Sequence, residues 1–180
     1  MRKALGIAGV LLLAVIAAAA VLLWYIRPAE TLDLSYRDIS IVEKVTEMVR
    51  KRELVVELDD DELSNLVKRA IAEKPQLTED VRITGVRVET ENGLLALHVN
   101  AVAKGFVKAG ATIYAKLEWR EPNLLLTLDR GAVKKLEIPG KYFSQQNFIV
   151  PLYDKLPALV GIKDIRLEDG KLRIMLKLLR

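Results

Sequence analysis

The chain has 180 residues, of which 51% are hydrophobic and 29% charged; its net charge is +4 and it contains no cysteine. This length suits one globular domain plus an apolar segment, and the composition excludes a disordered chain and a disulfide-stapled one. The absence of cysteine excludes a thiol nucleophile. A Cys/His zinc site is also excluded, because His98 is the only imidazole.

An uncharged run occupies residues 4–26. As a helix it would be about 35 Å long, against about 30 Å for the hydrocarbon core of a bilayer. Cations precede the run, and Trp24 and Tyr25 near its end suit a membrane interface. We therefore predict a single transmembrane helix, with a localisation at the cell membrane and the carboxy-terminal domain outside the cytoplasm. A signal peptide cleaved after Ala20 is the alternative.

The rest of the chain divides into a stalk and one domain. Residues 28–40 have no clean hydrophobic period and predict a short stalk, so residues 1–27 are assigned to the anchor and residues 41–180 to an extracytoplasmic α+β domain. Two helices are expected early in this domain, over residues 41–52 and 60–73, because each apolar stripe follows a capping box.

From Val81 the hydrophobic period changes from 3.6 to 2, which predicts mainly antiparallel sheet. A phase shift at Gly85 indicates a bulge, while Asn-Gly and Asp-Gly pairs at 92–93 and 169–170 indicate hairpins. A short helix is expected to begin near Pro151. The predicted fold class is α+β: a single transmembrane helix followed by a curled antiparallel sheet packed on one or two helices.

Few residues could carry chemistry. Asp59-Asp60-Asp61-Glu62 is dense enough for a calcium or magnesium site, but it lacks the glycine and the distal glutamate of an EF-hand, so we interpret it as a helix start, which needs no metal. For His98, in mid-strand, a solvated or hydrogen-bonded side chain is a simpler interpretation than a catalytic base. The chain has no Gly-rich phosphate loop and no G-x-S-x-G elbow. We predict no enzyme, no metal and no cofactor.

Charge differs between the two halves of the domain. Residues 28–91 hold 10 basic and 16 acidic side chains, a net charge of −6, whereas residues 92–180 hold 15 and 8, a net charge of +7. The basic sheet half could face anionic lipid headgroups or an anionic cell-wall polymer. Alternatively, the two halves only compensate each other. Nucleic acid is not expected as a partner, because the domain as a whole is close to neutral.

Small side chains recur on the two longest predicted strands. They either let the second helix pack closely on the sheet or leave room for an acyl chain. We predict an apolar ligand-binding site between the helix stripe and this alanine-bearing face. Its members are Leu63, Leu66, Val67 and Ile71 on the helix and Ala101, Ala103, Ala111 and Ala115 on the strands.

The order of these parts resembles that of a known family. The likeness is carried by the segments LVVELDDDELSNLVKRAI, LEIPGKYF and KLPALV and by the closing Asp-Gly hairpin. Together they resemble the YpmS-like family of membrane-anchored bacterial proteins of unknown function, a resemblance that implies no catalytic residues. The topology is also similar to small tubular lipid-binding folds, in which a curled sheet wraps a helix and leaves an apolar groove.

The predicted function is that of a membrane-anchored extracytoplasmic module that binds or transfers an apolar ligand, with membrane lipid as the nearest one. The alternative is a non-enzymatic structural or scaffolding subunit of an envelope complex that docks through its basic sheet half. An envelope enzyme and an anionic cell-wall polymer are further candidate partners. The alanines separate these hypotheses, because a groove tolerates Ala→Leu with loss of ligand whereas a closed core loses stability.

Overall fold

The structure, a computed structural model, describes residues 2–51, 54–139, 147–151 and 160–178. Within them the fold is α+β with antiparallel sheets, as predicted. The helices are α1 (Arg2–Tyr25), α2 (Ile41–Arg50) and α3 (Asp60–Glu73). The strands are β1 (Val55–Leu58), β2 (Gln76–Thr78), β3 (Val81–Glu91), β4 (Leu94–Ala103), β5 (Val107–Arg120), β6 (Asn123–Val133), β7 (Leu136–Pro139), β8 (Asn147–Pro151), β9 (Val160–Glu168) and β10 (Lys171–Leu178).

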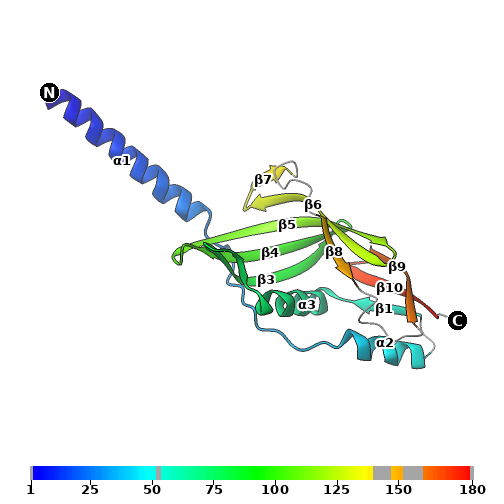
Figure 1. The fold of residues 1–180 in the computed structure, drawn as a ribbon. Helices are drawn as coiled ribbons and strands as arrows, with labels where there is room; N and C mark the ends of the chain where they lie inside the picture. Colours follow the sequence, from blue (N-terminus) through cyan, green and yellow to red (C-terminus); the bar gives the residue numbers. More distant parts are fainter. Residues whose placement is uncertain (1, 52–53, 140–146, 152–159, 179–180) are drawn as a thin grey trace.

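Helix α1 projects away from the sheets (Figure 1). Among the helices of the described residues, none is both long and apolar enough to cross a membrane. The fold-class prediction is therefore wrong in its single transmembrane helix over residues 4–26.

The larger sheet has seven strands and follows the order of the chain. Strands β2 to β7 pair antiparallel in sequence, and β8 also pairs with β6. The predicted bulge is present, because the register of β3 against β4 shifts between Ile83 and Gly85. The predicted turn at Asn92 and Gly93 is present too, with φ values of 50° and 75°, both in the region that a type I′ turn requires.

A second sheet of three strands has the order β1-β10-β9. The predicted hairpin joins β9 and β10, and both turn residues, Asp169 and Gly170, have positive φ. Strand β1 pairs with β10 from the other end of the chain, with Val56 opposite Ile174. The sequence predicted one sheet, and this long-range pairing is what divides it into two.

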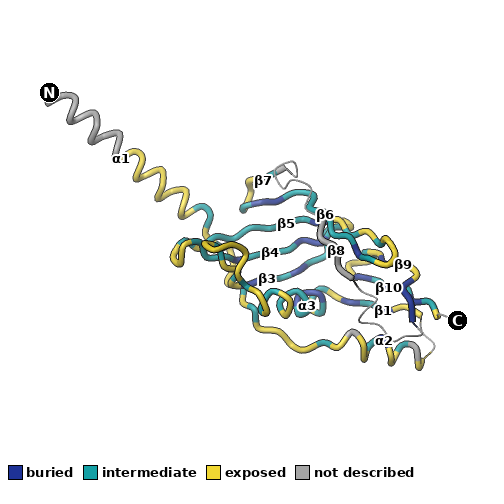
Figure 2. The backbone as a smooth tube through the Cα atoms, in the orientation of Figure 1, coloured by how far each residue is buried: buried dark blue, intermediate teal, exposed yellow. Residues whose placement is uncertain are grey.

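The hydrophobic core lies where the small sheet meets α2, α3 and one end of the large sheet. It includes Val45 of α2, Val56 of β1, Leu63 of α3, Val88 of β3 and Ile162 of β9, all buried. Buried backbone is correspondingly concentrated around β1 and β10 and along the adjoining parts of β3 and β4, whereas the loops near α1 are exposed (Figure 2). The large sheet therefore extends beyond its own core towards α1.

Helix α3 lies along the outer edge of β3 (Figure 1). Ser64 Oγ accepts a hydrogen bond from the backbone N–H of Val88 over 2.8 Å and donates to its carbonyl oxygen over 3.1 Å. One turn earlier, Asp60 Oδ1 accepts from the N–H and the hydroxyl of Thr90, over 3.0 and 2.9 Å. The helix thus satisfies backbone groups that an open strand edge would leave unpaired.

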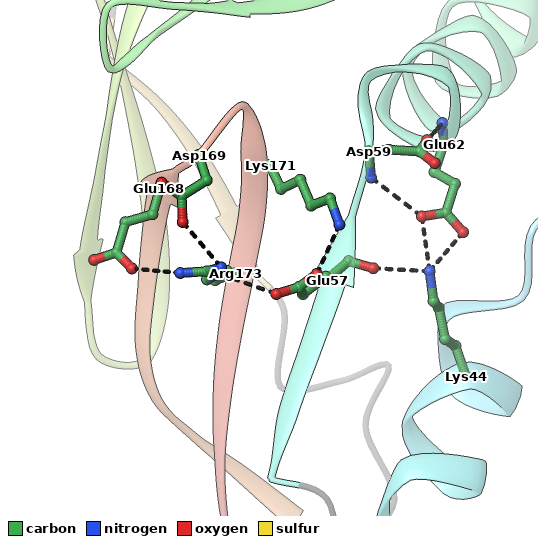
Figure 3. Close-up of polar contacts among 8 residues, drawn as sticks. All are labelled: Lys44, Glu57, Asp59, Glu62, Glu168, Asp169, Lys171 and Arg173. Carbon is green, nitrogen blue, oxygen red and sulfur yellow. Dashed lines mark hydrogen bonds and ion pairs between the residues drawn. The ribbon is translucent and has the colours of Figure 1, made fainter.

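The acidic run before α3 is a helix start, as predicted. Asp59 Oδ1 accepts from the N–H of Glu62 over 2.8 Å, and the Glu62 carboxylate accepts from the N–H of Asp59 over 3.2 Å, which completes a capping box. Figure 3 shows that Lys44 of α2 also reaches this carboxylate, over 2.5 and 2.7 Å, and the carbonyl oxygen of Glu57, over 2.8 Å. One lysine therefore joins α2, β1 and α3.

The Glu57 carboxylate continues this network into the small sheet. It accepts from Lys171 Nζ over 2.9 Å and from Arg173 Nε over 3.0 Å, and Arg173 also pairs with Glu168 and Asp169 of the hairpin (Figure 3). The hydrogen bond from Lys171, followed by that from Arg173, lowers the pKa of Glu57 below its ordinary value. These contacts join β1 to the β9–β10 hairpin.

Some boundaries differ from the sequence predictions. The sequence predicts a turn over residues 104–110, but strand β5 already begins at Val107. Strand β8 lies where prolines and glycines suggest irregular backbone, and it pairs with β6. The short helix expected after Pro151 falls outside the described residues.

Candidate ligand-binding cleft

The segment between α1 and α2 is extended and lies against the large sheet; we call residues 26–38 the strap. Three hydrogen bonds join its carbonyl oxygens to the sheet: Gly110 N–H to Ile26 (2.9 Å), Asn100 Nδ2 to Glu30 (2.8 Å) and Val86 N–H to Asp33 (3.3 Å). The segment predicted as a stalk, residues 28–40, is therefore held against the domain over its first part.

Two glycines permit the strap to approach the sheet so closely. A Cβ atom at Gly85 would overlap the backbone of Leu32, and a Cβ atom at Gly110 would lie 2.8 Å from the Cα atom of Pro28. Side chains at these positions would displace the strap, because glycine alone allows such an approach between two backbones.

Ion pairs hold the strap from both sides. They are Arg87 with Glu30 (2.8 Å), Lys68 with Asp33 (3.2 Å) and Arg69 with Asp38 (2.6 Å). The hydrogen bond from Lys68, with a further one from the N–H of Ser35, lowers the pKa of the Asp33 carboxyl. Exposed pairs of this kind stabilise weakly, so the backbone hydrogen bonds and the glycine contacts are the main determinants of the strap's position.

A cleft of about 950 Å³ opens between the end of α1, the strap and the β4–β5 hairpin. Most of its lining is apolar, and the apolar residues come from all three elements. They include Leu23 of α1, Pro28 and Leu32 of the strap, and Ala101, Val102, Phe106 and Val107 of the hairpin. The cleft therefore exists only because the strap is fixed beside the sheet.

The polar part of the lining includes two cations. Arg27 and Lys108 line the cleft, together with Asn100 and Glu30. Glu30 is occupied, because its carboxylate pairs with Arg87 and its carbonyl oxygen accepts from Asn100. An apolar cleft with two cations suits a ligand that has an apolar chain and an anionic group.

The four predicted ligand-binding residues of α3 lie away from this cleft. Leu63 is buried in the hydrophobic core, and Leu66 and Val67 pack against that core. Ile71 is half-buried one turn further along the helix. Because α3 lies along the edge of β3, its apolar stripe joins the core where the small sheet meets one end of the large sheet.

The four predicted alanines share one face of β4 and β5 but have different surroundings. The register places Leu95 opposite Ala115, Val99 opposite Ala111, Ala101 opposite Ala109 and Ala103 opposite Val107. Ala115 is 2% exposed and belongs to the filled core, Ala103 and Ala111 are half-buried, and Ala101 lines the cleft. The structure thus brings one of the eight predicted residues to the cleft.

The cleft residues absent from the sequence prediction are those of the hairpin tip and the strap. The run Lys104-Gly105-Phe106-Val107-Lys108 carries a usable signal, an aromatic residue between two lysines at a glycine turn. Arg27 and Pro28 carried no comparable signal, because their role depends on the strap returning to the sheet.

A second polar cluster lies across β3, β4 and β5. His98 Nε2 lies 3.0 Å from Glu89 Oε2, and His98 Nδ1 lies 3.1 Å from Thr112 Oγ1. A neutral ring satisfies both contacts when Nε2–H donates to Glu89 and Nδ1 accepts from the hydroxyl. The hydroxyl of Thr112, the imidazole of His98 and the carboxylate of Glu89 follow the order found around an activated nucleophile. Strand β5, however, pairs with β4 and β6, so its backbone amides are not free to stabilise an oxyanion.

Burial lowers the pKa of His98, and the positive charge of Arg87 lowers it further. The adjacent Glu89 carboxylate would by itself favour the imidazolium, but Arg87 lies directly against Glu89 and already compensates its charge. His98 is therefore neutral at neutral pH, which agrees with the hydrogen-bonded strand histidine expected from the sequence.

Among the described residues, Glu89, Glu91 and His98 could hold a metal ion, because one ligand atom of each lies within 4.8 Å of the others. The guanidinium of Arg87 against Glu89 opposes a cation at this place. The cluster is accounted for as an ion-pair and hydrogen-bond network on the sheet face.

Comparisons with protein-family models, with curated proteins and with solved structures found no match to this chain. The resemblance to the YpmS-like family therefore stays a prediction.

Proposed function

We propose that the protein binds an amphipathic lipid in the cleft between α1, the strap and the β4–β5 hairpin. The observation that carries the proposal is the combination of an apolar lining with two cations in a space of about 950 Å³. Sites for small ligands have volumes of about 300–1,000 Å³ and are mostly apolar with a few polar groups.

The apolar chain of the ligand contacts Leu23, Leu32 and Phe106, and the anionic group lies near Arg27 and Lys108. A phosphate or carboxylate is the group that such cations bind best, because the hydrogen bonds are charge-assisted. The strap contributes residues 27–32 to the lining and is fixed by hydrogen bonds to its carbonyl oxygens, so the unliganded protein already has the cleft. A preformed site keeps the entropic cost of binding low.

The proposal is tested on the purified full chain. Native mass spectrometry and lipid extraction identify any lipid that co-purifies, and a soluble single-chain anionic lipid is then titrated below its micelle concentration. Replacing Arg27 and Lys108 by Gln is expected to weaken binding about tenfold or more, the loss expected when charge-assisted bonds are removed. Replacing the exposed Arg50 and Lys163 by Gln removes the same charge elsewhere and is expected to leave binding unchanged.

Absence of binding to the unaltered chain would contradict the proposal and favour a structural subunit. Equal losses in the two double variants would show that net charge, and not the cleft, determines lipid binding.

A further inference from the structure

The end of the large sheet that meets α1 exposes apolar side chains. Phe106 at the tip of the β4–β5 hairpin is 75% exposed, and Leu136 at the start of β7 is 60% exposed. Trp24, in the last turn of α1, is exposed beside them, since the Nζ atom of Lys134 lies 5.1 Å from the centre of its ring. We call this region, with residues 104–108 and 134–136, the junction surface; Figure 1 shows both hairpin tips on the side of the molecule where α1 ends.

Basic side chains surround these apolar ones. They are Arg27, Lys104, Lys108, Lys134 and Lys135. Within the part of the chain that the structure describes, none of the five forms an ion pair, although the Nζ atom of Lys134 also lies 5.3 Å from the ring of Tyr25. Acidic residues lie near this surface as well: the exposed Glu137 follows Leu136 on β7, and Glu79 and Asp80 lie beside Lys104, whose N–H donates to the carbonyl oxygen of Asp80.

We propose that the junction surface docks on an anionic phospholipid bilayer, an inference that rests on the proposed function because the cleft draws its ligand from that bilayer. Aromatic and aliphatic side chains enter the interfacial layer, while lysines and arginines around them contact the headgroups. A soluble polyanion would engage the cations but leaves Phe106 and Leu136 without a partner. The bilayer accounts for both classes of side chain.

The position of the cleft agrees with this orientation. Phe106 and Lys108 belong to the junction surface and also line the cleft, as does Leu23 of α1. A lipid that leaves the bilayer at the junction surface therefore reaches the cleft without crossing open water. The core and the small sheet face away from the bilayer in this arrangement.

The absence of cysteine makes site-specific labelling straightforward. The full chain carries one environment-sensitive apolar dye at Phe106→Cys or at Leu136→Cys, the two hairpin tips, or at Leu178→Cys as a control that is also 60% exposed. Vesicles contain phosphatidylcholine alone or mixed with phosphatidylglycerol. Both tip labels are expected to brighten several-fold with anionic vesicles, and the label at position 178 is expected not to respond.

Charge reversal then separates docking from other causes. Lys104→Glu with Lys135→Glu leaves the cleft lining intact and is expected to weaken the tip response about tenfold or more, and high salt is expected to do the same. Arg50→Glu with Lys163→Glu reverses equal charge elsewhere and is expected to have no effect. A response at position 178 equal to that at the tips, or no response at the tips, would overturn the proposal.

The two proposals fail differently. If the soluble single-chain lipid binds but the tip labels ignore vesicles, docking is wrong and the function stands. If the tips respond and the soluble lipid does not bind, the surface meets membranes but the cleft does not hold lipid. A tip response to soluble polyphosphate and none to vesicles would identify an anionic polymer as the partner and overturn docking.

Discussion

The backbone N–H of Gly110 donates to the carbonyl oxygen of Ile26 over 2.9 Å, so the end of α1 is joined directly to strand β5. An ordinary linker after a helix would leave the helix free to reorient. Here the direction in which α1 leaves the domain is set by the sheet, and the cleft forms at the joint. The strap is therefore a structural element with a defined effect on stability.

Gly85→Ala is expected to displace the strap and to lower the free energy of unfolding by about 1–3 kcal/mol, because the added Cβ overlaps the backbone of Leu32. Hydrogen exchange of the Val86 amide reports the displacement, since that N–H donates to Asp33. Gly93→Ala is the control: it strains a residue with φ of 75° but meets no atom within 4 Å. In Gly93→Ala the Val86 amide should stay protected from hydrogen exchange. Loss of this protection in both variants would contradict the role of the close contact between Gly85 and Leu32.

Substitution by leucine at two alanines of one sheet face should have different effects on stability. Ala115→Leu is expected to lower stability by about 1–3 kcal/mol through overpacking, because Ala115 is 2% exposed in the core. Ala101→Leu is expected to keep the stability, because Ala101 is only half-buried, and to leave lipid binding unchanged, because its side chain lies on the face opposite to Asn100 and Gly110, which the strap covers. Denaturant unfolding and the soluble-lipid titration measure the two effects. Equal destabilisation in both variants would mean that the cleft end of the face is filled.

Local patterns in the sequence predicted most of the elements correctly. The helix over residues 60–73, the bulge at Gly85 and the two Asx-Gly hairpins depend on neighbouring residues, so their signals are present in short windows. The division into two sheets depends on β1 meeting β10, a pairing between distant segments that periodicity does not encode. For the same reason the ligand site was placed between α3 and the alanines: the sequence shows two apolar faces but not that α3 lies at the edge of β3.

Lys44→Met is expected to lower stability by about 1–2 kcal/mol. The side chains of Lys44 and Glu62 are only 24% and 26% exposed, and the change leaves the helix-capping carboxylate and the carbonyl oxygen of Glu57 without their lysine. Lys51→Met, in the same segment, alters the pair with Glu47, whose side chains are 50% and 52% exposed, and is expected to cost less than about 0.5 kcal/mol. Similar losses in the two variants would show that burial does not strengthen the Lys44 pair.

The strap and the hairpin tip show why the surface that we propose to bind lipid is the least predictable part of the chain. Residues 28–38 have no period because their backbone, and not an apolar stripe, contacts the sheet. Phe106 falls in the turn predicted over residues 104–110, and its exposure and flanking lysines are the features on which the proposed membrane contact rests. Surface features of this kind carry no constraint from core packing, which is the constraint that periodicity detects.

His98 is expected to titrate below its ordinary value of about 6.5, because burial and the charge of Arg87 both disfavour the imidazolium in the folded state. Between the folded and unfolded pKa values the unfolded chain binds more protons, so stability rises with pH in that interval. The contribution is complete above about pH 6.5 and is lost as the pH falls through the folded pKa. His98→Gln should remove this dependence. The pKa values of Asp33 and Glu57 are also lowered, but these carboxyl groups change the stability only at lower pH, below about 4.5.

The single imidazole makes the titration directly visible by NMR of the full chain. Arg87→Gln is expected to raise the pKa of His98, because the variant removes the repelling charge and releases the Glu89 carboxylate to favour the imidazolium. Denaturant unfolding between pH 7 and pH 5 should then show a weaker loss of stability in Arg87→Gln than in the unaltered chain, after correction for the lost ion pairs at pH 7. A His98 pKa at or above the ordinary value in the unaltered chain would mean that Glu89, and not Arg87, controls the ring.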